Sequence, residues 1–277
     1  MTATAPSRHR GWIDRPDCRI AYEVVGNGPP LVFAHGLGGS LMSWWQQVGH
    51  FASRYTCVTF SHRGFAPSTA PAGGPDPAAY AEDLAALVDK LGLGDISLVG
   101  QSMGGWTGVE YALLRPGRVK ALVLAATTGS IDPARLREPE RSLFDAWARE
   151  SASARAALAG RGVHPAAGAR MAREQPALHL LYSQMDGLSA GLDKEAVRAR
   201  LTATRRRAPA ELAAAGCRVL CLAGTEDMVM PPFAAAAIAS AVPGAQAVSV
   251  PEAGHSVYFE RAAAFNALVE AFLDASA

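Results

Sequence analysis

The sequence predicts an α/β fold with a mostly parallel, eight-stranded sheet that is flanked by helices and interrupted by a helical insertion. Short apolar runs alternate with stretches of helical spacing, which is typical of βαβ crossovers. Most of the runs lack period-two alternation, as expected of strands buried on both faces of a sheet. The expected strands of this kind are Leu31 to Ala34, Thr56 to Phe60, Ile96 to Val99, Val119 to Ala125, Val219 to Ala223, and Ala245 to Val250.

An antiparallel hairpin is expected at the start of the sheet. Its strands lie near Gly11 to Asp14 and Arg19 to Val25, and the turn sequence Arg15-Pro16-Asp17 joins them. The clearest helix begins at Asp76-Pro77, which is an N-cap followed by Pro at the first helical position. Its apolar stripe and its expected C-cap are Tyr80, Leu84, Leu87, Val88, Leu91 and Gly92. The last helix carries an apolar face of Phe265, Leu268, Val269 and Phe272.

The alternation of strands and helices breaks between residues 130 and 213, a segment rich in Ala and Arg. We therefore expect residues 1–129 and 214–277 to form the core, with residues 130–213 as a helical cap over the sheet. The cap holds 14 Lys or Arg against 10 Asp or Glu, and Arg205, Arg206 and Arg207 form its densest basic cluster. A solvated helix face is the first interpretation of this cluster, and attraction of acidic substrates is the alternative.

Composition argues against several classes of protein. Apolar residues make up 49% and charged residues 18% of the chain, which is ordinary for a globular protein, and the net charge of +1 indicates neither a nucleic-acid nor a membrane partner. The first ten residues lack the apolar segment of a signal peptide, and no stretch approaches the roughly 18 apolar residues of a membrane span. The cysteines have neither metal-ligand nor disulfide-scaffold spacing, so we expect reduced structural thiols in a cytoplasmic protein. They are Cys18, Cys57, Cys217 and Cys221.

The strongest chemical signal is Gly100-Gln101-Ser102-Met103-Gly104, which lies between an expected strand and a helical stretch. This is the G-x-S-x-G pattern of a nucleophilic serine on a sharp strand-to-helix turn. The serine there adopts a strained backbone conformation, so the residues two positions away must be small. The same turn places Ser102 at a helix N-terminus, where free N–H groups face a developing anion.

A second glycine-rich segment, His35-Gly36-Leu37-Gly38-Gly39, follows the expected strand Leu31 to Ala34. Its backbone N–H groups can turn toward a substrate carbonyl. An oxyanion hole in this fold uses one N–H group from this loop and the N–H group of the residue after the nucleophile, so we expect Leu37 and Met103 to form it. We interpret His35 as a structural hydrogen-bonding residue rather than an acid or base.

A carboxylate and a histidine follow the last two expected strands. Asp227 is the favoured orienting acid, with Asp132 and Glu226 as competitors, and His255 is the expected general base. The resulting order along the chain is Ser, Asp, His, and all three follow strands, whose carboxyl ends form the ligand-binding edge of parallel sheets.

These motifs make the chain similar to the α/β-hydrolase superfamily across nearly its whole length. It resembles the bacterial branch that contains 3-oxoadipate enol-lactonases and meta-cleavage-product C–C hydrolases, on the segments HGLGGS, SHRGFAPS, GQSMGGW, GTEDMVMPP and AGHSVYFE. The resemblance implies a Ser–His–Asp triad, an oxyanion hole and a helical cap. Relatives usually have Asp where this chain has Ser61, so we expect altered bonding in that loop without loss of catalysis.

The expected function is hydrolysis of a carboxylic ester or lactone of a small to medium organic molecule, without metal or organic cofactor. C–C bond hydrolysis of a meta-cleavage-type diketone is the next candidate. A non-hydrolytic lyase, cyclase or acyltransferase, or a ligand receptor with vestigial turnover, represents other classes. Candidate pocket residues, for which core packing is the alternative, are His35, Gly36, Trp106, Trp147, Tyr182 and Met185.

Overall fold

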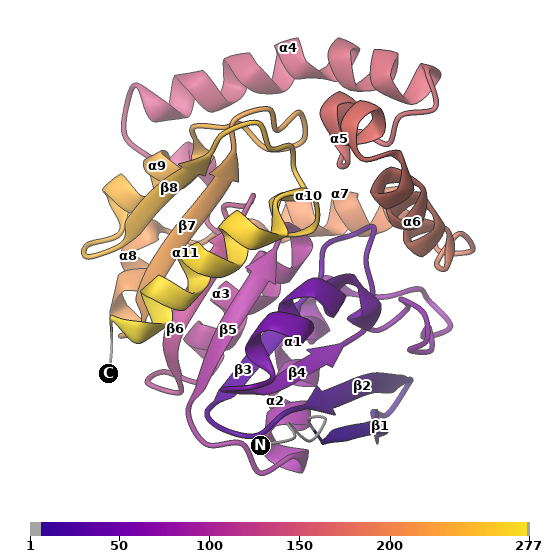
Figure 1. The fold of residues 1–277 in the computed structure, drawn as a ribbon. Coiled ribbons are helices and arrows are strands. Elements are labelled where there is room, and N and C mark those ends of the chain that lie inside the picture. Colours follow the sequence, from indigo (N-terminus) through magenta and orange to yellow (C-terminus); the bar gives the residue numbers. More distant parts are fainter. Residues whose placement is uncertain (1–6, 276–277) are drawn as a thin grey trace.

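An eight-stranded sheet forms the centre of the computed structural model, which describes residues 7–275 (Figure 1). Residues 1–6, which begin the segment without signal-peptide character, and residues 276–277 of the predicted core lie outside the described part. The strand order is β1-β2-β4-β3-β5-β6-β7-β8, with β2 antiparallel to β1 and β4 and all other pairs parallel. The strands are β1 Arg8–Asp14, β2 Arg19–Val25, β3 Pro30–Ala34, β4 Thr56–Phe60, β5 Ile96–Gln101, β6 Val119–Ala125, β7 Arg218–Gly224 and β8 Gln246–Val250. The predicted fold class and the initial hairpin are confirmed.

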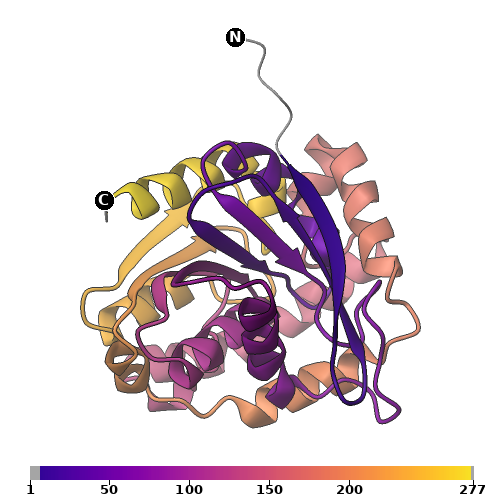
Figure 2. The same ribbon diagram turned by 90° about the horizontal axis from the view of Figure 1, so that it is seen from below.

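Helices cover both faces of the sheet. Figure 2, which views the molecule from below, shows them on either side of it. Leu31 and Phe33 of β3 pack with α1, α10 and α11, whereas Val32 and Ala34 pack with α2, α3, α8 and α9. Both sets are apolar because both faces are covered, which explains the continuous apolar runs. These helices are α1 Trp45–Phe51, α2 Tyr80–Lys90, α3 Met103–Leu114, α8 Pro209–Ala214, α9 Ala234–Ala241, α10 Val257–Glu260 and α11 Ala262–Asp274.

The helix predicted from Asp76-Pro77 begins with a 3₁₀ turn over Pro77–Ala79 that continues into α2. The Asp76 side chain accepts a hydrogen bond from the Ala78 N–H, as an N-cap does. At the other end Gly92 has a φ of 61°, the left-handed conformation of a C-cap glycine. Both predicted ends of this helix are confirmed.

Four helices between β6 and β7 lie over the carboxyl ends of the strands (Figure 1). They are α4 Glu140–Gly160, α5 Gly168–Glu174, α6 Pro176–Gly187 and α7 Lys194–Thr204. The division into core and cap remains a prediction. Its boundary at residue 213 falls inside α8, whose Leu212 packs in the same apolar cluster as α3 and α9.

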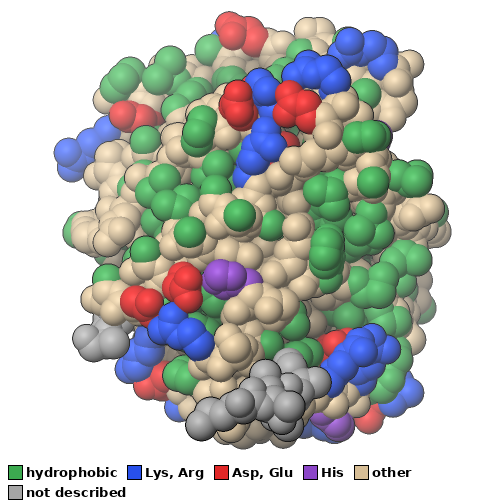
Figure 3. Space-filling model, viewed as in Figure 1, with side chains coloured by type: hydrophobic (Ala, Val, Ile, Leu, Met, Phe, Trp, Pro, Cys, Tyr) green, Lys and Arg blue, Asp and Glu red, His purple; other side chains and the backbone are tan. Residues whose placement is uncertain are grey.

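On the face seen in Figure 3, basic and acidic side chains lie in mixed groups rather than in a field of one sign. Arg54 lies 2.8 Å from carboxylate oxygens of both Glu270 and Asp274. Within residues 7–275, no helix combines the length and apolar character needed to cross a bilayer.

Candidate active site

Ser102 occupies the sharp turn between β5 and α3. Its φ of 50° and ψ of −115° lie in a region that residues with a Cβ rarely adopt. A Cβ on Gly100 would lie 2.5 Å from the Gly104 carbonyl oxygen, and one on Gly104 would lie 1.9 Å from the Ala34 carbonyl oxygen. The two glycines of the motif are therefore required by close backbone packing around the serine.

Replacing Ser102 by glycine tests this strain. The free energy of unfolding of Ser102→Gly is expected to exceed that of Ser102→Ala by about 1 kcal/mol, because glycine adopts positive φ without a Cβ penalty. The glycine variant should therefore unfold at a higher denaturant concentration. Chemical denaturation of the two variants measures the difference. Equal stability, or a less stable glycine variant, would show that the turn stores no strain at this residue.

His255 and Asp227 form a buried pair. His255 Nδ1 lies 2.9 Å from Asp227 Oδ2, and the two residues are 3% and 2% exposed. The other carboxylate oxygen, Oδ1, accepts the backbone N–H groups of Val229 at 2.7 Å and Met230 at 2.9 Å. Both oxygens are thus occupied, which holds the carboxylate in one orientation against the imidazole.

The competing acids make other contacts. Glu226 is directed to the surface, where Arg170 donates to both of its oxygens. The Asp132 side chain accepts the Ala134 N–H at 2.9 Å and caps a 3₁₀ turn. The structure therefore pairs His255 with Asp227 and with neither alternative.

His35 belongs to a buried chain of neutral hydrogen bonds. Its Nδ1 donates to the Gly36 carbonyl at 2.7 Å, and its Nε2 accepts the His62 backbone N–H at 3.0 Å. The His62 ring lies 3.2 Å from His35 Nε2 and 2.9 Å from the Thr107 hydroxyl. Burial lowers the pKa of His35 to about 4 and that of His62 well below its ordinary value, so both rings stay neutral and brace the glycine loop.

Ser61 braces the same region from the loop after β4. Its hydroxyl accepts the Leu41 N–H at 3.0 Å and donates to the Ala66 carbonyl at 2.9 Å. A neutral hydroxyl thereby links two loops where relatives are expected to carry a carboxylate, and neither of its two hydrogen bonds involves Asp227 or His255.

A cavity of about 690 Å³ lies between the strand ends and the helices α4, α6 and α7, a size suited to a small organic ligand. Ser102 and His255 line it together with Leu37, Met103, Trp106 and Tyr182. The described cavity wall does not include His35, Gly36, Trp147 or Met185. His35 and Met185 are buried in packing, Gly36 lies against the Gln101 side chain, and Trp147 is covered by the Arg155 guanidinium.

Comparison with known proteins decides the family. Residues 29–262 match the family described as alpha/beta hydrolase fold. The chain belongs to this family. This hydrolase is 32% identical over 256 residues to BpoC of Mycobacterium tuberculosis, which carries a provisional name as a non-heme bromoperoxidase; the match covers 89% of this chain and 94% of that protein. An esterase structure from Thermogutta terrifontis superposes with a TM-score of 0.76 at 28% identity, covering 96% of this chain and 98% of the other.

A shorter match relates this hydrolase to 3-oxoadipate enol-lactonase 2 of Acinetobacter baylyi. The two are 32% identical over 120 residues, which is 43% of this chain and 45% of the lactonase. The predicted resemblance to the α/β-hydrolase superfamily is confirmed, and the chain is an enzyme of that family.

Two contacts in the hydrolase site escaped sequence reasoning. Gln101 Nε2 donates to the His255 carbonyl at 3.2 Å, which ties the serine turn to the histidine loop. Glu260 Oε1 accepts the N–H of Gly254, directly before His255. No signal in the motif marks Gln101, whereas the spacing of Glu260 after His255 places it on the following helical turn, α10.

The carboxyl group of Glu260 is buried, which raises its pKa from 4.5 to about 7. Its favourable contribution to folding is complete below the unfolded pKa and is lost as pH rises through about 7. Glu260→Gln cannot ionise and still offers an acceptor to Gly254. We therefore expect the free energy of unfolding of this variant, relative to that of wild type, to rise by on the order of 3 kcal/mol as the pH increases from about 4.5 to about 8.

Urea unfolding of wild type and Glu260→Gln at both ends of this pH range measures the gain. A difference in stability that is the same at both pH values would contradict the raised pKa.

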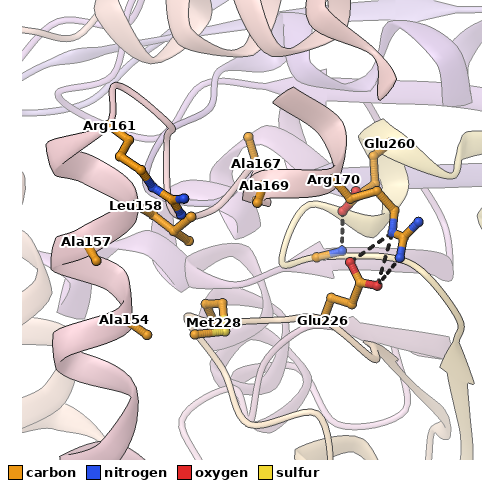
Figure 4. A pocket seen from close by; sticks show the side chains of 12 residues that line it. Ala154, Ala157, Leu158, Arg161, Ala167, Ala169, Arg170, Glu226, Met228 and Glu260 are labelled. Atoms are coloured by element: carbon orange, nitrogen blue, oxygen red, sulfur yellow. Dashed lines mark hydrogen bonds and ion pairs between the residues drawn. The ribbon is translucent and has the colours of Figure 1, made fainter. Parts of the chain in front are cut away.

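A second cavity of about 380 Å³ borders the loops that carry Asp227 and His255 (Figure 4). Helices α4 and α5 form one part of its wall, and Glu226, Met228 and Glu260 form another. The Arg170–Glu226 ion pair borders it. Its wall contains neither Ser102 nor His255, so it is separate from the cavity of the hydrolase site.

Metal-binding groups do not gather in the part of the hydrolase from residue 7 to residue 275, where no three His, Cys, Asp or Glu side chains form a candidate site. All four cysteines are unpaired. Burial raises the pKa of Cys57 and of Cys221 to about 12, so these thiols stay protonated at neutral pH.

Proposed function

We propose that this hydrolase cleaves a carboxylic ester or lactone of a small to medium organic molecule through an acyl-enzyme on Ser102. The observation that carries the proposal is the buried His255–Asp227 pair, 2.9 Å apart, whose histidine lines the same cavity as the strained serine. Nucleophile, base and orienting acid are thereby assigned to Ser102, His255 and Asp227.

In the first step His255 takes the proton of Ser102 through Nε2 while the serine oxygen attacks the substrate carbonyl. Asp227 keeps the other ring proton on Nδ1 and stabilises the imidazolium. Backbone N–H groups of Leu37 and Met103 bind the tetrahedral oxyanion, each donor contributing about 3 kcal/mol. Met103 is the first residue of α3, so the helix dipole supports the same charge. The tetrahedral intermediate then collapses: the bond from the carbonyl carbon to the alcohol oxygen breaks, and His255 gives its proton to that departing oxygen, which leaves an acyl-Ser102. His255 next takes a proton from a water that attacks the acyl carbon, and it returns this proton to Ser102 as the acid is released.

Esterase and enol-lactonase relatives favour ester or lactone cleavage over C–C bond hydrolysis. Helices α4 to α7 would serve as the cap that encloses the substrate over Ser102. Lyase, cyclase and acyl-transfer outcomes would use the same residues but release different products, so product analysis separates them.

Labelling with a fluorophosphonate tests the activated serine. Wild type is expected to gain one adduct by intact mass, located on Ser102 by peptide mapping, whereas His255→Ala gains none in the same time. His50→Ala is the matched control, because His50 is an exposed histidine 3.3 Å from Glu270 and should label as wild type does. A folded wild type that takes no label would contradict the proposal.

A further inference from the structure

The three arginines after α7 differ sharply in their surroundings. Arg207 is neutralised by Glu110 at 2.8 Å and Glu211 at 3.1 Å. Arg206 is exposed to solvent. Arg205 is partly buried and lines the cavity that contains Ser102, with its Nε donating to the Gly129 carbonyl at 3.3 Å. Its guanidinium has no carboxylate within 4 Å in the described part of the chain.

The other charges of this cavity do not compensate Arg205. The two carboxylates on its wall, Asp186 and Glu195, are each paired with a cation of their own, Lys194 and Arg198 respectively. The fourth cation, Arg155, donates to the Ser151 hydroxyl and to the Met228 carbonyl at 3.1 Å, and it too lacks a carboxylate partner among residues 7–275. The cavity therefore carries two uncompensated guanidinium groups.

Burial makes this arrangement costly without a ligand. Desolvation lowers the pKa of Arg205 from its ordinary value, and the nearest acidic influence, Asp132, opposes this only in part. Asp132 is committed to its own cap on the Ala134 N–H. A partly desolvated guanidinium binds a carboxylate strongly, because the planar groups form two parallel charge-assisted hydrogen bonds.

We propose that Arg205, supported by Arg155, binds a carboxylate of the substrate, so that the hydrolase acts on an ester or lactone that also carries a free carboxylate. This inference rests on the proposed function and narrows its substrate class. Arg205 would set specificity by binding the anionic end of the substrate while the carbonyl lies at Ser102.

The test compares esters that differ only in a terminal carboxylate. The para-nitrophenyl half-esters of succinate, glutarate and adipate are measured against para-nitrophenyl butyrate, valerate and hexanoate at constant ionic strength. Wild type should prefer at least one half-ester by kcat/KM. Arg205→Gln should lower that preference about tenfold or more, as loss of a charge-assisted pair predicts. Arg205→Lys, which keeps the charge without the planar fork, should fall between them.

Arg206→Gln is the matched control, since it removes an equal charge from the exposed neighbour and should keep the wild-type preference. If wild type favours no half-ester, or Arg205→Gln lowers both ester types equally, the proposal is overturned.

Binding without turnover separates this inference from the proposed function. Ser102→Ala is titrated with glutarate, succinate and adipate by calorimetry, with and without Arg205→Gln. Dicarboxylate binding that is lost with Arg205→Gln would support the carboxylate site. If wild type at the same time cleaves no ester, the proposal of ester hydrolysis is overturned while the carboxylate site stands. If wild type hydrolyses esters but shows no half-ester preference, and no dicarboxylate binds, the proposed function stands and the carboxylate site is overturned.

Discussion

Ser102→Ala is expected to lower kcat for the preferred ester by at least about four orders of magnitude, with little change in KM. The alanine removes the attacking oxygen but keeps the turn between β5 and α3, the cavity and both proposed oxyanion donors. Residual turnover would then come from water attacking a carbonyl that Leu37 and Met103 still polarise. Steady-state turnover with active-site concentration fixed by protein mass measures the loss.

Ser240→Ala provides the control for removing a serine hydroxyl, since Ser240 lies on α9 and donates to the Ala237 carbonyl of the same helix. It should retain wild-type kcat. A Ser102→Ala variant that keeps a tenth or more of wild-type kcat would mean that a water activated by His255, rather than the serine, attacks the substrate.

Asp227→Asn is expected to lower kcat by about four orders of magnitude while leaving the fold intact. In wild type Oδ1 accepts the N–H groups of Val229 and Met230, and Oδ2 faces His255 Nδ1. Asparagine has one acceptor oxygen, and the two backbone donors hold it. Its NH₂ group therefore faces Nδ1, which forces the ring proton onto Nε2, where a base for Ser102 must be unprotonated.

Two neighbouring carboxylates serve as controls for this variant. Glu226→Gln breaks an exposed ion pair with Arg170, and Asp132→Asn alters a 3₁₀ cap, so both should keep kcat within about twofold of wild type. Loss of kcat in Asp132→Asn with retention in Asp227→Asn would reassign the orienting acid. Thermal unfolding of all three variants separates catalytic loss from loss of fold.

Local sequence was sufficient for the elements whose pattern and ends are encoded by neighbouring residues. Thr56–Phe60 and Val119–Ala125 agree with prediction at both ends, since each is an apolar run with clear boundaries. β8 begins at Gln246 rather than at Ala245, because exposed side chains on this edge strand blur the apolar pattern. The G-x-S-x-G turn was predictable because its strained geometry admits few residues on either side of the serine.

Pocket residues were less predictable, because helical spacing in residues 130–213 is the same for a side chain that faces ligand and one that faces core. Tyr182 and Met185, three residues apart on α6, both pack in the same apolar cluster, and of the two Tyr182 alone also lines the cavity. Likewise Arg205, Arg206 and Arg207 are identical in sequence terms and differ only in what the folded chain brings to them.

The sequence by itself determined the α/β fold, the placement of the candidate Ser, Asp and His in loops that follow strands, and the turn that exposes Ser102, because each depends on local patterns of apolar residues and glycine. Only the tertiary structure decided that His255 pairs with Asp227 instead of Asp132 or Glu226, that Glu260 braces the histidine loop, and that Arg205 enters the cavity uncompensated. Those outcomes depend on contacts between residues far apart in the chain, whose distances and desolvation arise only when the strand ends and the helices above them come together.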